Sequence, residues 1–510
     1  MTSTAPTTPI AKRSAARLRV RAVSVVSAIE LEEPCSPCAA YERFRGQSYP
    51  WLLESALVRS DVGRYSFAGA SPEFVLRIRD GRVRVEGRRA DLAATLLPET
   101  RTGGVDPFEV LGALLPPAPV RVPPEVAAVP FLGGAVACLG YELGAFTEPV
   151  PMKTLDELGL DDLVALFVDR VVVFDHESQR SWAVGLGCGE DAEEAQRRAE
   201  RASASLAEQV RGLRYEAQTT DDAARVKPPR TELPSRAQLR SDPARYAKSI
   251  AELLQQIELG NVYQVNLTQR IDVPYAGDPW ALYRALRYRN PAPFAACIEL
   301  PEVAVLSSSP ERFLRVSTDG RVQSRPIKGT RPRSAVRRED AELAHALAHS
   351  PKDRAENLMI ADLVRNDLGR VCKTGTVEVP SLMAIEPFAS VWQMVSTVEG
   401  ELREDLSALD LVYASFPPGS MTGAPKIAAM EWIDREEPVR RTLYSGALGY
   451  FDARGGIDTS VVIRTVLLKD GCAHLHAGGG VVADSSPEGE YRESLDKASA
   501  LFDALELADG

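Results

Sequence analysis

The order of the segments with strand character constrains the fold more than any other feature of this sequence. Beyond residue 240, apolar and β-branched segments follow one another directly, as at 295–299, 303–307 and 312–316. Further strands are expected at 262–271, 445–451, 457–468 and 473–475, and helices at 245–259, 279–289, 336–370, 408–414, 425–435 and 487–507. Runs of adjacent strands, in place of a strict strand–helix repeat, indicate antiparallel pairing. The pattern therefore predicts an α+β fold with antiparallel sheets.

Composition changes along the chain and divides it into four parts. Residues 1–22 are basic and contain no acid, which predicts a disordered N-terminus, with an organelle transit peptide as the alternative. Residues 23–214 contain strand-like segments and a charged amphipathic helix at 190–212, and are expected to form an N-terminal region. Residues 215–240 are polar and contain prolines, which is typical of a linker, and residues 241–508 are the second predicted domain.

Charge and cysteine content exclude several classes of protein. The formal charge of −11 disfavours binding to nucleic acid, which requires a basic face. No run approaches the roughly 18 uncharged apolar residues of a membrane-spanning helix. Seven scattered cysteines, an odd number without regular spacing, indicate a reducing cytoplasm. The single C-x-x-C at Cys35 and Cys38 lacks a second pair, so neither a zinc site nor a redox role is expected there.

One short basic turn is the first candidate for chemistry. Residues 325–331 read Arg-Pro-Ile-Lys-Gly-Thr-Arg, so a proline that fixes one dihedral angle and a glycine that admits close backbone approach flank Lys328. A lysine held in this way can anchor an anion, or lose its proton in a pocket and act as a nucleophile. The alternative is an ordinary basic turn at the surface.

Two predicted helices each carry a pair of acidic residues three positions apart. Asp353 and Glu356 form one pair, and Glu490 and Glu493 form the other. Residues three apart share a helix face, so two such faces that meet would make an oxygen-only site suited to Mg²⁺. The alternative is a pair of solvated faces whose carboxylates form ion pairs with arginines of the same helices.

Two glycine-rich segments precede predicted helices. Gly478–Gly480 follow a strand, and residues 417–426 enter a helix in the same way, so that backbone N–H groups can converge on an anion. A strand bulge or a hinge is the alternative for the first segment. Arg464, inside the β-branched segment 457–468, is hard to bury without an anionic partner.

Four segments of the second half resemble the chorismate-utilising enzymes. They are Pro326–Arg333, Ala355–Arg370, Pro418–Lys426 and Gly478–Tyr491, and the similarity extends over residues 240–505. The family includes the large subunits of anthranilate synthase and aminodeoxychorismate synthase, isochorismate synthase and salicylate synthase. The resemblance implies an enzyme with the chorismate-binding fold, in which antiparallel β-sheets form a sandwich flanked by helices.

The resemblance also implies ligands for particular residues. Mg²⁺ would be bound by Glu356 and Glu493, with Asp353 and Glu490 close by, and would hold the ring carboxylate of chorismate. Further contacts to the substrate are implied for Gln264, Gly329, Thr330, Gly423, Tyr450, Arg464, Gly478, Gly479, Gly480 and Lys497. An amino-acid pocket is implied by Glu54, Ser55, Asn290, Pro291 and Pro293.

Three positions indicate which reaction of the family to expect. Gln264 stands where salicylate and isochorismate synthases have a lysine that activates water, and since glutamine cannot accept a proton near neutral pH, ammonia is the expected nucleophile. Lys328 matches a lysine of the aminodeoxychorismate synthases, where anthranilate synthases have alanine. Gln393 replaces a histidine of the anthranilate synthases. The resemblance thus implies amination of chorismate at C4, with an anthranilate synthase large subunit as the alternative.

In the C4 reaction that the resemblance implies, Lys328 bonds to the ring and ammonia later displaces it. Glu311 matches the general acid that protonates the leaving hydroxyl, for which it must keep a proton near neutral pH. Because the chain has no Gly-x-Cys-x-Gly segment, the ammonia is expected from glutamine through a separate glutamine amidotransferase subunit. The product would serve p-aminobenzoate and folate synthesis. A non-catalytic regulator that binds chorismate or an amino acid is a further alternative.

Overall fold

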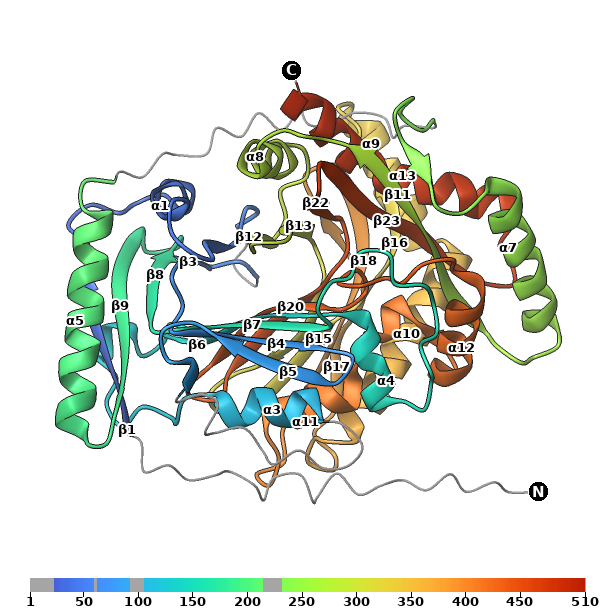
Figure 1. The fold of residues 1–510 in the computed structure, drawn as a ribbon. Coiled ribbons are helices and arrows are strands. Elements are labelled where there is room, and N and C mark those ends of the chain that lie inside the picture. Colours follow the sequence, from blue (N-terminus) through green and yellow to red (C-terminus); the bar gives the residue numbers. More distant parts are fainter. Residues whose placement is uncertain (1–22, 59–61, 92–104, 214–231, 510) are drawn as a thin grey trace.

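The computed structural model describes residues 23–58, 62–91, 105–213 and 232–509. Within these ranges, two large β-sheets form the centre of the molecule and helices cover them from outside (Figure 1). Neighbouring strands in both sheets are antiparallel. The predicted α+β fold with antiparallel sheets is therefore confirmed. None of the described helices is long and apolar enough to cross a membrane.

The first sheet contains 12 strands, of which β11 and β23 carry polar residues of the site described below. Along the sheet the order is β1 (Val23–Glu30), β9 (Arg180–Gly189), β8 (Arg170–Asp175), β3 (Tyr65–Gly69), β2 (Trp51–Glu54), β12 (Phe294–Glu299), β13 (Ala304–Ser309), β22 (Thr465–Lys469), β23 (Cys472–Val481), β11 (Gln264–Pro274) and β10 (Gln238–Leu239). The short strand β19 (Gly423–Ala424) pairs with the start of β11.

The second sheet contains 11 strands. Its order is β16 (Ile327–Pro332), β18 (Val391–Glu401), β15 (Arg321–Arg325), β14 (Arg312–Val316), β21 (Ile457–Val461), β20 (Ala447–Asp452), β6 (Gly134–Leu139), β7 (Leu163–Val168), β4 (Phe74–Arg79) and β5 (Arg82–Glu86), with β17 (Glu378–Pro387) paired to β18. The basic turn of the sequence thus forms the edge strand β16.

Strands from the two halves of the chain share both sheets. In the first sheet β2 pairs with β12, so that Leu53 lies opposite Ala296, and in the second sheet β6 pairs with β20. The N-terminal region and the second predicted domain are therefore joined by continuous hydrogen-bonded sheets. The boundary between them remains a prediction, because residues 1–22 and most of the expected linker at 215–240 lie outside the described residues.

Helices flank both sheets. They are α1 (Pro37–Phe44), α3 (Pro107–Leu114), α4 (Gly144–Thr147), α5 (Ala192–Val210), α7 (Pro243–Glu258), α8 (Pro279–Arg289), α9 (Arg337–Ala348), α10 (Pro351–Gly369), α11 (Ala408–Ser415), α12 (Lys426–Glu436) and α13 (Pro487–Asp509), with short 3-10 turns η2 (Pro124–Val126), η3 (Tyr141–Leu143) and η4 (Gly419–Met421). Proline stands at the start of several, as in α7, where the Asp242 side chain accepts a hydrogen bond from Ala244 N.

The structure corrects three boundaries. The helix predicted at 336–370 is two helices, α9 and α10, because Ser350 caps a new helix that begins at Pro351. The strand predicted at 457–468 is two strands that belong to different sheets, separated at Arg464, whose φ is +48°. The strand expected at 473–475 continues to Val481 as β23. The second correction matters most for the site, because Arg464 lies between two strands and not within one.

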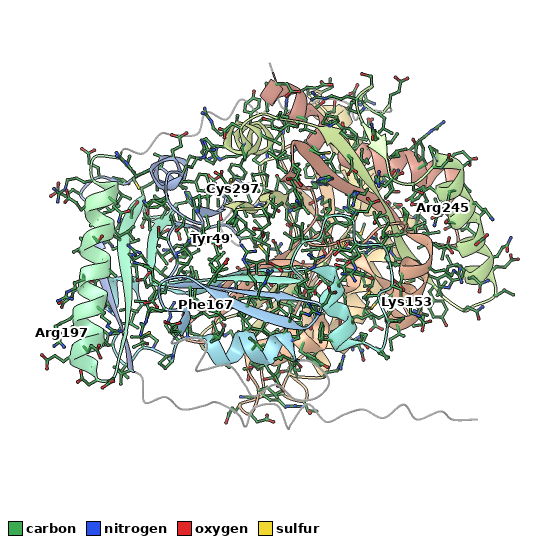
Figure 2. All side chains as sticks on the ribbon, viewed as in Figure 1. Tyr49, Lys153, Phe167, Arg197, Arg245 and Cys297 are labelled. Atoms are coloured by element: carbon green, nitrogen blue, oxygen red, sulfur yellow. The ribbon has the colours of Figure 1, made fainter. Side chains whose placement is uncertain are left out.

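Apolar side chains fill the space between the sheets. One aromatic cluster contains Phe67, Phe131 and Tyr450, with ring centroids 5.6 Å apart for Phe67–Phe131 and 4.8 Å apart for Phe131–Tyr450. Figure 2 shows Phe167 within the body of the molecule, whereas Arg197 on α5 and Arg245 on α7 lie at opposite ends. The buried aromatic core gives the two sheets a fixed relative position.

Candidate active site

A cavity of about 520 Å³ lies among β11, β23, β16, β18, α10 and α13. We call it the first cavity. Of the residues expected from the sequence, its wall contains Lys328, Glu311, Gly329, Thr330, Arg464, Gly478, Gly480, Lys497, Asp353, Glu356 and Glu493. The basic strand, the two acidic faces and the glycine-rich strand are thus brought together around one space, as the motifs suggested.

Lys328 extends from the edge strand β16 into this cavity. Its Nζ donates a hydrogen bond of 2.9 Å to the carbonyl oxygen of Ser420 in η4. Burial, followed by the charge of Lys497, lowers the pKa of Lys328, while nearby carboxylates oppose this shift. Gly329, with φ of +92°, sits so close to α10 that an added Cβ would lie 2.9 Å from the Cβ of Asp353. Only glycine therefore lets the strand bring the amine to this place.

Glu311 lies between β13 and β14 and is buried, with 4% of its surface exposed. Burial raises the pKa of this carboxyl group to about 7, although a hydrogen bond with Ser420 and the charge of Lys328 both lower it. A carboxyl group with this pKa keeps its proton in part at neutral pH and can donate it. Ser420 contacts both groups, with its carbonyl oxygen to the amine and its side chain to the carboxyl.

The two acidic pairs occupy α10 and α13 on one side of the cavity. Lys352 lies between them, with Nζ 3.9 Å from Glu356 and 3.7 Å from Glu490. Lys497 Nζ lies 2.8 Å from Glu493 and also donates to the carbonyl oxygen of Gly478 at 2.9 Å. Glu356 and Glu490 therefore lie on either side of one lysine and are largely buried, whereas the Glu493 side chain keeps 42% of its surface exposed.

The acidic faces have the chemistry of a Mg²⁺ site. Glu490 Oε2 is buried and has no hydrogen-bond partner, and an added Cβ at Gly479 would lie 2.4 Å from it. Burial and the charge of Glu493 raise the pKa of Glu490, so the carboxylates are in an environment that favours a neutralising cation. Within the described residues, no group of three or more His, Cys, Asp or Glu side chains is arranged to hold a metal ion. A site with two carboxylates fits Mg²⁺, which keeps several waters and binds substrate oxygens.

Asp353 has a different role from the other three acids. It forms an ion pair of 2.7 Å with Arg331, which lies next to Thr330 on β16. The carboxylate thus holds the basic strand against α10, and it lines the cavity from that position.

Arg464 lies at the break between β21 and β22 and lines the cavity. Burial lowers the pKa of its guanidinium group, and the carboxyl group of Glu311 opposes this shift. The guanidinium forms no hydrogen bond or ion pair with the residues that the structure describes. A positive φ is unfavourable for a residue other than glycine. Such a conformation persists where the surrounding structure fixes it, and it is common at functional sites. The arrangement suits an anionic ligand.

Tyr450 does not line this cavity, which corrects one expectation. It lies on β20 with its ring against Phe131 and lines a different cavity. Tyr444, six positions earlier, lines the first cavity instead and stacks on His476 with ring centroids 5.0 Å apart. Within a strand, successive side chains point to opposite faces of the sheet. The sequence motif did not show where β20 begins, so it could not show which tyrosine faces the first cavity.

Gly478–Gly480 also differ from the expectation. They form the end of β23, paired with β11, rather than a loop before a helix. Gly423, with φ of +146°, pairs with Val265 and lies outside the wall of the first cavity. Gln264 is buried behind Gly480, and neither its Nε2 nor its Oε1 has a hydrogen-bond partner.

Three neutral side chains of the wall were missed or given no ligand by the sequence analysis. Asn266 Nδ2, Gln393 Oε1 and His476 Nε2 are each buried without a partner. Burial, with the charges of Arg270 and Arg441, lowers the pKa of His476 well below its ordinary value, so the imidazole is neutral at pH 7. Unsatisfied buried polar groups are costly unless a ligand or water completes them. For Asn266 on β11 and His476 on β23, the available signal was their even positions, which share one sheet face, whereas Gln393 lies on β18 of the other sheet.

A second cavity of about 300 Å³ lies between the halves of the chain, and its lining includes Glu54, Ser55 and Pro293, which were assigned to the predicted amino-acid pocket. Asn290 instead lines the first cavity, and Pro291 lines neither. Glu54 is held by Arg287, Tyr283 and Cys38 through contacts at 2.7, 2.9 and 3.8 Å. The second cavity is thus a separate space with its own buried charges.

Comparisons with known proteins agree with this geometry. The family model described as chorismate binding enzyme matches residues 104–503. The chain is 38% identical over 478 residues to aminodeoxychorismate synthase component 1 of Klebsiella aerogenes, covering 93% of this chain and 98% of that protein. It is 40% identical to the aminodeoxychorismate synthase of Streptomyces griseus, but spans only 65% of that longer protein and 96% of its own length. It is also 36% identical to anthranilate synthase component 1 of Bacillus caldotenax, covering 93% and 92% of the two chains.

Solved structures show the same fold. Anthranilate synthase component I from Streptococcus pneumoniae superimposes with a TM-score of 0.68 at 27% identity, covering 93% of this chain and 99% of that one. The menaquinone-specific isochorismate synthase from Escherichia coli has a TM-score of 0.66 at 17% identity, with 94% of each chain covered. Family model, sequence relatives and structures agree, and the chain belongs to the chorismate-binding enzyme family.

Proposed function

We propose that the protein is the large subunit of an aminodeoxychorismate synthase, which aminates chorismate at C4 through a covalent bond to Lys328. One observation carries the proposal. The amine of Lys328, with a lowered pKa, and the carboxyl group of Glu311, with a pKa of about 7, line one cavity and share Ser420 as a partner. A nucleophile that is neutral in part and an acid that is protonated in part are what a displacement on the ring requires.

In the first step the Lys328 nitrogen bonds to C2 of the ring. The two ring double bonds shift, the C4–O bond breaks, and Glu311 gives its proton to the departing hydroxyl, which leaves as water. Ammonia then bonds to C4, the double bonds shift back, and the C2–nitrogen bond breaks so that Lys328 leaves as a neutral amine. The new C4 ammonium returns one proton to Glu311, and atoms and charges balance.

The remaining wall residues bind the substrate in this proposal. Arg464 and Tyr444 donate hydrogen bonds to one substrate carboxylate. Lys497, which is paired with Glu493, adds a positive charge near the same carboxylate. Glu356 and Glu493 would hold Mg²⁺, which polarises and orients the ring carboxylate when bound. Glu490 lies close enough to support that site from α13.

Ammonia is supplied in this proposal by a partner glutamine amidotransferase. Relatives that carry the words component 1 in their names support a two-subunit arrangement. Free ammonia would substitute for the partner at high concentration.

Anthranilate synthase is the second candidate, because relatives of that name are 36% identical. Product analysis separates the two. The purified protein is incubated with chorismate, Mg²⁺ and ammonium, and the products are separated by chromatography. We expect 4-amino-4-deoxychorismate, which a lyase converts to p-aminobenzoate. Fluorescent anthranilate as the main product would overturn the proposal, and binding of chorismate without turnover would favour a regulator.

A further inference from the structure

A buried ion pair lies behind the wall of the first cavity. Arg441 and Glu437 have side chains that are 1% and 4% exposed, and two hydrogen bonds of 2.8 and 2.6 Å join the guanidinium to the carboxylate. Neither residue lines the cavity. Removing two charged groups from water costs free energy. A buried ion pair is therefore stable only if further hydrogen bonds satisfy its remaining donors and acceptors.

The additional bonds of this pair join two parts of the wall. Arg441 donates to the carbonyl oxygen of Met421 at 2.8 Å and to that of Asn266 at 2.7 Å. Glu437 accepts from both the backbone N–H and the hydroxyl of Thr268, each at 2.8 Å. The Arg441–Glu437 ion pair therefore connects the turn η4 to the strand β11. Met421 and Asn266 both line the cavity.

The turn that the pair holds also carries the partner of the reacting groups. Ser420 precedes Met421, its carbonyl oxygen accepts the hydrogen bond from Lys328, and its side chain bonds to Glu311. A third wall residue is linked as well, because the backbone N–H of Tyr444 donates to the carbonyl oxygen of Arg441 at 3.1 Å. The buried pair therefore bonds to Met421, and the neighbouring residue, Ser420, contacts both proposed catalytic groups.

We propose that Arg441, fixed by Glu437, is a positioning residue that sets the distance between the Lys328 amine, the Glu311 carboxyl group and the ring. The inference rests on the proposed function in assigning reacting roles to Lys328 and Glu311. Arginine is required because its planar group binds the carboxylate with two donors and still reaches two carbonyl oxygens, which the point charge of lysine cannot do. A displacement of about 1 Å at a reacting atom is enough to lower a rate by about 100-fold.

The experiment compares Arg441→Lys with a matched control, Arg454→Lys. Arg454 also forms an ion pair, with the buried Asp452, and donates to the carbonyl oxygen of Val129, but it does not line the first cavity. We measure Tm, and kcat and KM for the loss of chorismate with ammonium. Arg441→Lys is expected to lower kcat by at least about 30-fold with KM within about 3-fold, while Arg454→Lys lowers Tm similarly but leaves kcat within about 3-fold.

A second readout does not depend on turnover. Lys328 is labelled with an amine-selective reagent at fixed pH, and its peptide is quantified by mass spectrometry. Arg441→Lys frees the turn that holds Ser420, so labelling of Lys328 is expected to rise at least about 3-fold, whereas it stays unchanged in Arg454→Lys. If Arg441→Lys does not fold, Thr268→Val, which removes one bond to Glu437, takes its place with an expected fall in kcat of about 5-fold.

Three results would overturn the inference. They are equal losses of kcat in the Arg441 and Arg454 variants, a loss confined to KM, and unchanged labelling of Lys328. Because loss of chorismate is followed whatever is formed, a product other than 4-amino-4-deoxychorismate would contradict the proposed function and leave the kcat comparison to decide the role of Arg441.

Discussion

The two cavities have no lining residue in common, and they differ in how some of their charged groups are paired. In the second cavity Glu54 is bound to Arg287, and Arg312 is bound to Asp458 by two hydrogen bonds of 2.9 Å. In the first cavity Arg464 has no partner among the described residues, although it lies near a carboxyl group of raised pKa. Asp353 and Glu493 of the first cavity are paired as well, with Arg331 and Lys497, so the contrast concerns Arg464. A buried cation without a partner is costly, and an anionic ligand would complete it.

The same contrast holds for neutral groups. Asn266, Gln393 and His476 line the first cavity with buried polar atoms that lack partners, and no residue of the second cavity has such an atom among those described. The cost of these atoms is recovered only when substrate or water completes them. We therefore expect substitutions in the first cavity to change activity, and substitutions in the second cavity to change stability.

Replacing the nucleophile should give the largest effect. Lys328→Ala is expected to lower C4 amination by at least about 10⁴-fold, because the covalent step is lost. Lys328→Arg is expected to fail as well, since a guanidinium group stays protonated. Steady-state amination is measured, with Lys373→Ala, at an exposed lysine paired to Glu404, as the control. Rates in the alanine variant close to those of the wild type would reduce Lys328 to an anchor.

The acidic faces should give the next largest effect. Glu356→Gln or Glu493→Gln is expected to lower Mg²⁺-dependent turnover by about 10²–10³-fold, since neutral amides bind the cation weakly. Turnover is titrated with MgCl₂ while circular dichroism monitors folding. Glu342→Gln, on the exposed face of α9, is the matched control. An unchanged dependence on Mg²⁺ would contradict the metal assignment.

The pH dependence should test Glu311. Its carboxyl group has a pKa of about 7 and must donate a proton, whereas Lys328 must be neutral, so kcat is expected to rise on the acid side and to fall about tenfold per pH unit above the higher of the two pKa values. The profile of kcat is recorded between about pH 5.5 and 9 with saturating chorismate. A profile of kcat with the same alkaline fall in Glu311→Gln as in the wild type would mean that another group protonates the leaving hydroxyl.

The same group links stability to pH. The folded-state pKa lies above the ordinary value of 4.5, so the stabilisation from its proton is complete below 4.5 and is lost as pH rises to about 7. The wild type should lose up to about 3 kcal/mol of unfolding free energy relative to Glu311→Gln over this range. Urea denaturation of both proteins at pH 5 and pH 8 measures the difference, and a difference near zero would contradict the burial of a charge at this site.

The smallest effect on activity is expected in the second cavity. Glu54→Gln leaves the guanidinium of Arg287 without its anionic partner and should lower the unfolding free energy by about 3 kcal/mol. In protein that remains folded, kcat should change by less than about 3-fold. Urea denaturation and kcat at a temperature well below Tm are compared. A fall in kcat above tenfold would mean that the two cavities are energetically coupled.

Much of the first cavity followed from local sequence. Lys328, Glu356 and Glu493 stand in segments whose spacing already placed amine and carboxylates on defined faces, and the structure brings them to one wall. Gly329 was interpretable as a point of close backbone approach, but the prediction of a tight turn was wrong, because the segment is the edge strand β16. The break between α9 and α10 was also available in the sequence, since Ser350 and Pro351 form a start signal that the long helix prediction passed over.

The remainder depended on tertiary structure. Whether Tyr444 or Tyr450 faces the substrate depends on where β20 begins, and the break at Arg464 depends on its two flanking strands joining different sheets. Arg441 and Glu437 are four residues apart, a spacing typical of an ordinary surface pair, and only the packing of η4 on β11 buries them. No local pattern contains that information.

The most direct test of the account is a search for the bond between Lys328 and the ring. Protein is mixed with chorismate and Mg²⁺ without ammonia, quenched within one turnover, digested, and analysed by mass spectrometry. We predict that the peptide containing Lys328 gains the mass of chorismate less one water, and that later addition of ammonium removes it as 4-amino-4-deoxychorismate forms. Formation of that product at the normal rate with no modified Lys328 peptide would contradict the account.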